Sequence, residues 1–163
     1  MSIQKGDPIP DAQLFDIDEQ GAPRSVSASA RLAGKRIVLF AVPGAFTRTC
    51  SEKHLPSFVQ HAEAITAQGV DEIVCVAVND PMVMAAWAHE YGATGKISML
   101  SDGLCEFTRA MGMEQDLSSR GYGMRSKRYA MLIENGKIAE ISVEPPGEYG
   151  VSSGEAVLQR LGA

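Results

Sequence analysis

The stretch VPGAFTRTC, Val42–Cys50, joins a segment typical of a buried strand to a segment typical of a helix. The residues before it, KRIVLFAV (Lys35–Val42), form a short apolar run rich in Ile, Val and Phe, which predicts a strand. The residues after it, Ser51–Gly69, repeat apolar side chains at steps of three and four, which predicts an amphipathic helix ending at a glycine. Cys50 therefore stands at a strand-to-helix junction. A cysteine in that place can be structural or chemical.

The composition is that of a globular protein, with 45% hydrophobic and 21% charged residues, and we expect a single domain over residues 1–163. The net charge of −5 argues against nucleic acid or an anionic membrane as a partner, because binding to phosphate needs clustered Lys and Arg. No apolar stretch approaches the roughly 20 residues of a membrane span. The N-terminus lacks a signal-peptide layout, and the three cysteines lack the spacing of a disulfide scaffold or a metal site. We therefore expect a cytoplasmic protein.

The rest of the chain alternates predicted strands and helices. Further strands are predicted over Glu72–Val78, Lys96–Leu100, Arg128–Glu134 and Lys137–Glu144, and further helices over Met82–Gly92, Leu104–Gly112 and Ser152–Leu161. The dipeptide Asn135–Gly136 is the strongest short signal for a hairpin, and Ser152 is a candidate helix cap. This order predicts an α/β fold with a mixed sheet and helices on both faces. Cys50 follows the C-terminal end of a strand, where sites form in such sheets.

The stretch around Cys50 resembles the P-x-x-x-T-x-x-C motif of the peroxiredoxins, with Pro43, Thr47 and Cys50 in the fixed places. Five further blocks resemble the type II, or atypical, branch of that family in matching order: KHLPSF, CVAVNDPMVMAAWA, LSDG, RSKRYAMLIENGKI and VEPPGEYGVSSGEAVL. The likeness runs from about residue 3 to residue 161. It implies a thioredoxin-like three-layer α/β/α fold. It also implies an antioxidant thiol peroxidase that reduces hydrogen peroxide and organic hydroperoxides through a cysteine thiolate.

Cys50 is the predicted peroxidatic cysteine. Thr49 and Glu52 match a T-x-x-E capping box, which predicts Thr49 as the N-cap and Cys50 as the first helical residue. The free N–H groups and positive end of a helix favour thiolate over thiol. A better-stabilised thiolate is also a weaker nucleophile, so the net gain in rate is only a few-fold. A fast peroxidase therefore needs fixed donors aimed at the oxygen that departs when the O–O bond breaks.

Candidates for those donors lie close to Cys50 in the sequence. Thr47 is expected to offer its hydroxyl to the peroxide, and Thr49 and Cys50 their backbone N–H groups. Pro43 is expected to form a rigid wall, without an N–H, that shields the sulfur from water and over-oxidation. These four residues make up the predicted peroxide pocket together with one cation.

The cation is assigned by the resemblance to Arg128, at the start of a predicted strand. Arginine suits this role because its forked donors can reach both sulfur and peroxide and because it keeps its charge. Its neighbours Arg125 and Lys127 compete for the role. His54 lies one helical turn after Cys50 and could tune the site, but a histidine on a helix face is more often structural, so we leave it out of the catalytic set.

The other cysteines are predicted to be secondary. Cys75 lies in a wholly apolar strand, which favours a buried small hydrophobe; in some type II relatives a cysteine at this place pairs with the peroxidatic one, so a resolving role stays open. Cys105 matches no motif, and we expect it to be structural. Two positions depart from the family: Arg48 stands where relatives often carry proline, and Ser153 where some atypical members place the resolving cysteine.

These features predict a peroxidase that needs no metal or organic cofactor and is reset by an external thiol, with glutathione and glutaredoxin favoured over thioredoxin. The resemblance also implies a homodimer that pairs near Phe46 and the turn Asn79–Met82. A thiol–disulfide oxidoreductase on the same fold is an alternative, disfavoured because Thr47 stands where a C-x-x-C motif needs a cysteine. A redox sensor that reacts with peroxide but does not turn over is the second alternative.

Overall fold

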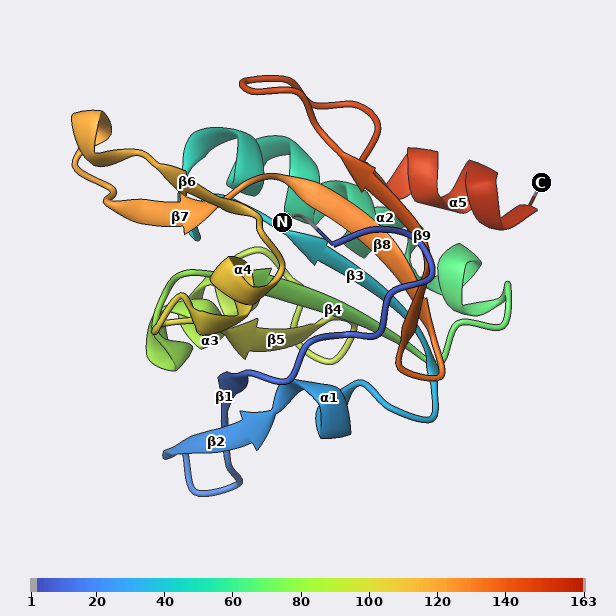
Figure 1. Ribbon diagram of the computed structural model, residues 1–163, viewed down its shortest axis with the longest axis horizontal. Coiled ribbons are helices and arrows are strands. Elements are labelled where there is room, and N and C mark those ends of the chain that lie inside the picture. The colour runs from blue at the N-terminus through green and yellow to red at the C-terminus, as the bar shows by residue number, and fades with distance from the viewer. Residues whose placement is uncertain (1–2, 163) are drawn as a thin grey trace.

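A seven-stranded mixed sheet forms the centre of the computed structural model, which describes residues 3–162 (Figure 1). Its strands lie in the order β2-β1-β5-β4-β3-β8-β9, and β6 and β7 form a separate two-stranded ribbon. The strands are β1 (Gln13–Ile17), β2 (Pro23–Ser27), β3 (Arg36–Ala41), β4 (Glu72–Ala77), β5 (Ser98–Ser101), β6 (Glu114–Asp116), β7 (Met124–Ser126), β8 (Tyr129–Glu134) and β9 (Lys137–Val143). The helices are α1 (Ala28–Arg31), η1 (Cys50–His54), α2 (Leu55–Thr66), α3 (Pro81–Glu90), α4 (Glu106–Ala110), η2 (Ser118–Arg120) and α5 (Gly154–Gly162).

The sheet separates two hydrophobic clusters, which explains why its central strands are apolar throughout. Val38 and Phe40 of β3 face one cluster, together with residues of α2, α3 and α5. Ile37 and Leu39, next to them in the chain, face the other cluster, together with residues of α1 and α4. Successive side chains of a strand point to opposite faces, so a strand covered on both sides has no polar position. The predicted three-layer arrangement around a mixed sheet is confirmed.

Strand β3 lies between a parallel and an antiparallel neighbour, and this arrangement places the candidate site. It pairs in parallel with β4, with Leu39 opposite Val74. It pairs antiparallel with β8, with Ala41 opposite Tyr129. The C-terminal end of β3 therefore meets the N-terminal end of β8. The residues that follow β3 and those that precede β8 therefore lie close together, at the ends of these two inner strands.

The predicted hairpin is confirmed between β8 and β9. Asn135 and Gly136 have φ angles of 50° and 79°, the left-handed values that a two-residue type I′ turn requires. The predicted cap of the last helix is wrong by one residue: the Ser153 hydroxyl accepts from the N–H of Ala156 at 3.1 Å. Ser152 is instead bound to Glu144, with its hydroxyl 2.6 Å from the carboxylate.

Helix α5 packs against the N-terminal half of α2 at a glycine. A Cβ atom on Gly154 would stand 2.5 Å from the carbonyl oxygen of Ser57, so only glycine allows this approach. The N–H of Gly154 also donates to the Ser57 hydroxyl at 2.9 Å. No helix among residues 3–162 is long and apolar enough to cross a membrane.

Candidate active site

The sulfur of Cys50 and the guanidinium of Arg128 meet at the edge of the sheet where β3 ends and β8 begins. Arg128 directly precedes β8, and its Nη2 donates to Sγ of Cys50 at 3.2 Å. Of the competing cations, Arg125 instead reaches the carbonyl of Pro43 with Nη1 at 3.2 Å. Lys127 uses its backbone N–H to bind the carbonyl of Met113. The structure thus brings the predicted arginine, and not its neighbours, to the predicted thiol.

The helix that carries Cys50 begins earlier than the sequence predicts. Arg48 and Thr49 already have helical backbone, and within the described residues Thr49 makes no capping bond. The first turn closes with the N–H of Ser51 donating to the carbonyl of Thr47 at 2.9 Å. The predicted capping box is therefore wrong, because Thr49 lies inside the helix that it was expected to cap. The N–H groups of Thr49 and Cys50 still belong to the first turn, where no helical carbonyl precedes them.

The segment Cys50–His54 is wound as a π-helix before α2 continues as a regular α-helix. Ser51 and His54 are buried, and the Ser51 hydroxyl accepts from the indole N–H of Trp87 in α3 at 2.9 Å. Short π-helical turns often occur at functional sites. This turn directs Cys50 and His54 toward the same guanidinium.

The hydroxyl of Thr47 is already engaged within the loop. It donates to the carbonyl of Gly44 at 2.6 Å, which uses the one proton that a hydroxyl has. Its oxygen keeps lone pairs that can accept a hydrogen bond from a peroxide O–H. Thr47 is therefore better placed to accept a hydrogen bond from a peroxide than to donate one, which changes the role that the sequence predicts.

Two side chains from other parts of the chain hold the loop 43–47 in place. The amide oxygen of Asn79, after β4, accepts from the N–H of Ala45 at 2.8 Å. Arg125 lies along the loop so closely that a Cβ on Gly44 would stand 2.6 Å from its Nη1. Phe46, at the tip, has a φ of 62°, a conformation that a bulky residue rarely adopts, and its side chain is half exposed. The loop is thus fixed from two sides around an unusual backbone.

His54 is a residue of the site that the sequence interpretation left out. Its Nδ1 accepts from Nη1 of Arg128 at 2.8 Å, and its Nε2 lies 2.8 Å from the carbonyl of Ser152. The ring is packed between the aromatic side chains of Phe40, Phe58 and Tyr149. The available signal was its position four residues after Cys50, which places both side chains on one side of the helix.

The family of the chain follows from comparison with known proteins. A family model described as Redoxin matches residues 4–158. Peroxiredoxin-2C of Oryza sativa subsp. japonica is 46% identical over 159 residues, which cover 98% of each chain. This chain belongs to the peroxiredoxin family. Peroxiredoxin-2C of Arabidopsis thaliana is 43% identical over the same length and coverage.

Solved structures resemble this peroxiredoxin over almost its whole length. The reduced Prx3 of Vibrio vulnificus in complex with hydrogen peroxide has a TM-score of 0.94 and 43% identity, over 98% of this chain and 99% of that one. Peroxiredoxin 5 of Alvinella pompejana has a TM-score of 0.86 and 37% identity, over 98% of each chain. The predicted type II peroxiredoxin with a thioredoxin-like fold is confirmed, and with it the activity of a thiol peroxidase.

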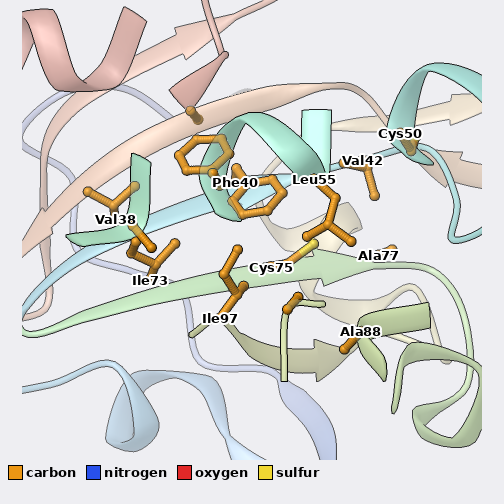
Figure 2. Packing of buried hydrophobic residues seen from close by; sticks show 14 of the residues in the cluster. Val38, Phe40, Val42, Cys50, Leu55, Ile73, Cys75, Ala77, Ala88 and Ile97 are labelled. Carbon is orange, nitrogen blue, oxygen red and sulfur yellow. The ribbon is translucent and has the colours of Figure 1, made fainter. Parts of the chain in front are cut away.

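The other two cysteines of the peroxiredoxin lie in apolar surroundings. Cys75 is fully buried in β4, and burial raises the pKa of its thiol well above the ordinary value. Figure 2 shows it beside Leu55 in the core, with Leu55 and Val42 between it and Cys50 in this view. Cys105 precedes α4 with a φ of 60°, and burial raises the pKa of its thiol as well. All three cysteines are free in this structure.

Proposed function

We propose that Cys50 is the peroxidatic cysteine of this thiol peroxidase. The single observation that carries the assignment is the 3.2 Å contact between its sulfur and Arg128. In the proposed step the thiolate attacks the outer oxygen of a peroxide, the S–O bond forms and the O–O bond breaks. The sulfur is oxidised to a sulfenic acid, and the departing oxygen takes up a proton and leaves as water or an alcohol.

The residues around the sulfur divide the work of this step. Arg128 supplies a permanent positive charge next to the sulfur and the breaking bond, where negative charge moves onto the departing oxygen. The N–H groups of Thr49 and Cys50 add donors at the helix end. Thr47 accepts a hydrogen bond from the peroxide and so orients it. Pro43, in the same loop, has no N–H, and we retain its proposed role as a wall that shields the sulfur from water.

Hydrogen peroxide and organic hydroperoxides are the proposed substrates. Cys50 is fully buried, so a local movement of the surrounding chain must open a path from the solvent to the sulfur. The electrons come from the thiol itself, and we propose that the reaction needs no metal or organic cofactor. Among residues 3–162, no group of three or more His, Cys, Asp or Glu side chains is arranged to hold a metal ion.

Glutathione, with glutaredoxin, is the proposed reductant. A glutathione thiol displaces water from the sulfenic acid to form a mixed disulfide, and a second thiol then releases Cys50 and carries away the disulfide. Cys75 would have to leave the middle of β4, where its strand pairs with both β3 and β5. Burial also raises the pKa of its thiol, which leaves little thiolate to attack. Ser153 supplies no thiol at all.

Mass spectrometry after one equivalent of peroxide tests both proposals. With glutathione present we expect a glutathione adduct on Cys50, and steady-state turnover with glutathione and glutaredoxin. A rapid and complete Cys50–Cys75 disulfide, with thioredoxin-driven turnover that vanishes in Cys75→Ser, would show that thioredoxin, and not glutathione, is the reductant. Oxidation that leaves Cys50 untouched would overturn the peroxidatic assignment itself.

We also propose a homodimer in the cytoplasm. Phe46 and Met82 expose about half of their side chains beside the active-site loop, and Tyr91 contacts the Phe46 ring at a centroid distance of 6.4 Å. Exposed apolar groups of this kind favour a two-fold interface, in which each copy uses the same patch. Light scattering of wild type and Phe46→Asp is the test: a monomeric wild type at micromolar concentration contradicts the proposal.

The proposed location in the cytoplasm is supported by the three cysteines, which are free and therefore favour a reducing compartment.

A further inference from the structure

The guanidinium of Arg128 is held by both of its ends. Nη2 donates to the sulfur of Cys50 at 3.2 Å, while Nη1 donates to Nδ1 of His54 at 2.8 Å. A guanidinium is planar and its two terminal nitrogens move together. The position of the imidazole therefore sets the angle at which the other nitrogen meets the sulfur.

The hydrogen-bond pattern fixes the tautomer of His54. Arginine has donors and no acceptor, so the Nδ1 that faces Arg128 must be the unprotonated nitrogen. The ring proton is then on Nε2, which donates to the carbonyl of Ser152 at 2.8 Å. The ring is completely buried. Neither nitrogen is free to exchange its role.

His54 stays neutral in this place. Burial first, and the positive charge of Arg128 second, lower the pKa of His54 from 6.5 to about 3. The charged and titratable groups that face it are Arg128 before β8, Glu144 after β9, Tyr149 in the following loop, and Cys50 on its own helix. The Ser152 carbonyl and Glu144 favour the charged ring, but less strongly. Between pH 5 and 8 its acceptor is therefore always available.

The carbonyl of Ser152 is itself fixed by Glu144. The Glu144 carboxylate accepts from the N–H of Gly150, the N–H of Ser152 and the Ser152 hydroxyl, at 2.7, 2.8 and 2.6 Å. The backbone N–H of Glu144 donates to the carbonyl of Arg128 at 2.9 Å. Burial opposes ionisation of this side chain, yet these hydrogen bonds lower the pKa of Glu144. One residue thus holds the backbone at Arg128 and the loop that orients His54.

We propose that His54 is a positioning residue of the peroxidase: a neutral imidazole, locked as the Nε2–H tautomer by Ser152, that orients Arg128 without cancelling its charge. A carboxylate in the same place would hold the guanidinium more tightly, but would compete with the thiolate and with the departing oxygen for its positive charge. An apolar residue would leave the charge of Arg128 intact, but its Nη1 would lose its hydrogen-bond partner. This inference rests on the proposed role of Arg128.

Four replacements of His54 separate its two hydrogen bonds from its charge. Asn places a neutral acceptor near the position of Nδ1, so it keeps the bond to Arg128. Gln places an N–H near the position of Nε2, so it keeps the bond to Ser152. Asp has the shape of Asn with a negative charge, and Leu removes both bonds. Phe58→Leu is the matched control, because it loosens the same aromatic packing and leaves the polar contacts of Arg128 in place.

Two rates are measured for each variant: oxidation of Cys50 by hydrogen peroxide and its alkylation by iodoacetamide. Alkylation needs the thiolate but breaks no O–O bond. We expect His54→Leu to slow peroxide oxidation by roughly tenfold or more, of the order that a displaced catalytic group costs, and to change alkylation much less. His54→Asn should stay close to wild type, with a pH profile that superimposes between pH 5 and 8. His54→Asp should be slower than His54→Asn.

The outcomes distinguish this inference from the function on which it rests. Peroxide and alkylation rates that fall together in His54→Leu, or a Phe58→Leu variant that behaves like it, would show a merely structural histidine. A His54→Asn variant as slow as His54→Leu would overturn the role of the acceptor. If Arg128→Ala reacts normally with peroxide, the proposed function fails instead. In the Arg128→Ala background, His54→Leu should have no further effect on the peroxide rate. If His54→Asp does not fold, the comparison of His54→Asn with His54→Leu still tests the proposal.

Discussion

Cys50 and Cys75 are both fully buried, and both belong to the same hydrophobic cluster. Their surroundings differ in charge. Cys50 lies in the first turn of a helix with Arg128 at 3.2 Å, whereas Cys75 lies within β4 between two paired strands. Burial by itself raises a thiol's pKa and makes it inert. With Cys50 as the proposed peroxidatic residue, the comparison teaches that a buried cysteine can serve as a nucleophile where the fold also places a cation and the open end of a helix beside it.

Exchanging each thiol for a hydroxyl in turn is the most direct way to break this comparison. We expect Cys50→Ser to lose all peroxidase activity, because the hydroxyl is a far weaker nucleophile, while Cys75→Ser and Cys105→Ser stay largely active. Peroxide consumption with glutathione as reductant measures the effect. Substantial turnover by Cys50→Ser would falsify the assignment of the peroxidatic residue.

Removing the guanidinium of Arg128 should leave Cys50, like Cys75, buried without a cation beside its sulfur, and so slow its reaction with peroxide. We expect Arg128→Ala to slow peroxide reduction by roughly 10²-fold or more, of the order of losing one preorganised donor. Arg128→Lys keeps the charge but cannot reach sulfur and His54 at once, so it should recover only part of the rate. Stopped-flow oxidation of Cys50 gives the rate directly. A normal rate in Arg128→Ala would mean that the helix end alone activates the thiol.

The pH dependence of the free energy of unfolding tests whether His54, the partner of Arg128 beside Cys50, is neutral in the folded protein. Because its pKa is lowered to about 3 in the folded protein, the unfolded chain takes up the proton first as the pH falls below 6.5. Stability linked to His54 is therefore complete above pH 6.5 and is lost as the pH drops from 6.5 toward 3. Urea unfolding should show wild type losing about 2 kcal/mol more than His54→Asn between pH 7 and pH 5. Equal losses would mean that the folded protein tolerates a charged ring.

The loop 43–47, which precedes Cys50, offers a smaller test. Arg125 binds the Pro43 carbonyl and packs on Gly44. We expect Arg125→Ala to slow peroxide reduction by roughly threefold to tenfold through a less well held loop, far less than Arg128→Ala. Gly44→Ala should act in the same way, since its Cβ displaces the guanidinium, and should cost less when Arg125 is already alanine. An effect of Arg125→Ala larger than that of Arg128→Ala would reverse their roles.

Arg48 should matter least. Its side chain is exposed, and its ion pair with Glu52, which is also exposed, spans 3.4 Å, a kind of contact that adds little stability. It occupies the first turn of the helix, where proline is well tolerated. We expect Arg48→Pro to change the free energy of unfolding by less than about 0.5 kcal/mol. Thermal unfolding at two salt concentrations checks this, and a large salt-dependent loss would contradict it.

The central layers of the fold were predictable because their signals are local. The apolar runs of β3 and β4, the Asn135–Gly136 turn and the spacing of the helix α2 each appear within a few residues. The edge hairpin β1–β2 and the ribbon β6–β7 were not predicted. Most of their residues are exposed or only partly buried, so they lack the hydrophobic pattern that marks a strand.

The site was predictable only in part. The positions of Cys50 and Arg128 came from motifs, and the structure brings them together. The capping box and the Ser152 cap were wrong, because the first helix begins two residues before the expected start and the last helix begins one residue after it. The role of His54 depends on Ser152, which lies 98 positions away in the chain, and no local pattern reports such a pairing.

The distance in sequence between thiol and cation has a consequence for the life of the protein. Cys50 and Arg128 are 78 positions apart, and they meet only when β8 pairs with β3. A chain that has left the ribosome only as far as β7 already contains the cysteine, but not the arginine. Its thiol then lacks the guanidinium that we propose as its partner in the reaction. With the roles proposed for Cys50 and Arg128, the reactive pair of thiol and cation is therefore assembled late, when β8 adds to β3 and only β9 is still to be placed in the sheet.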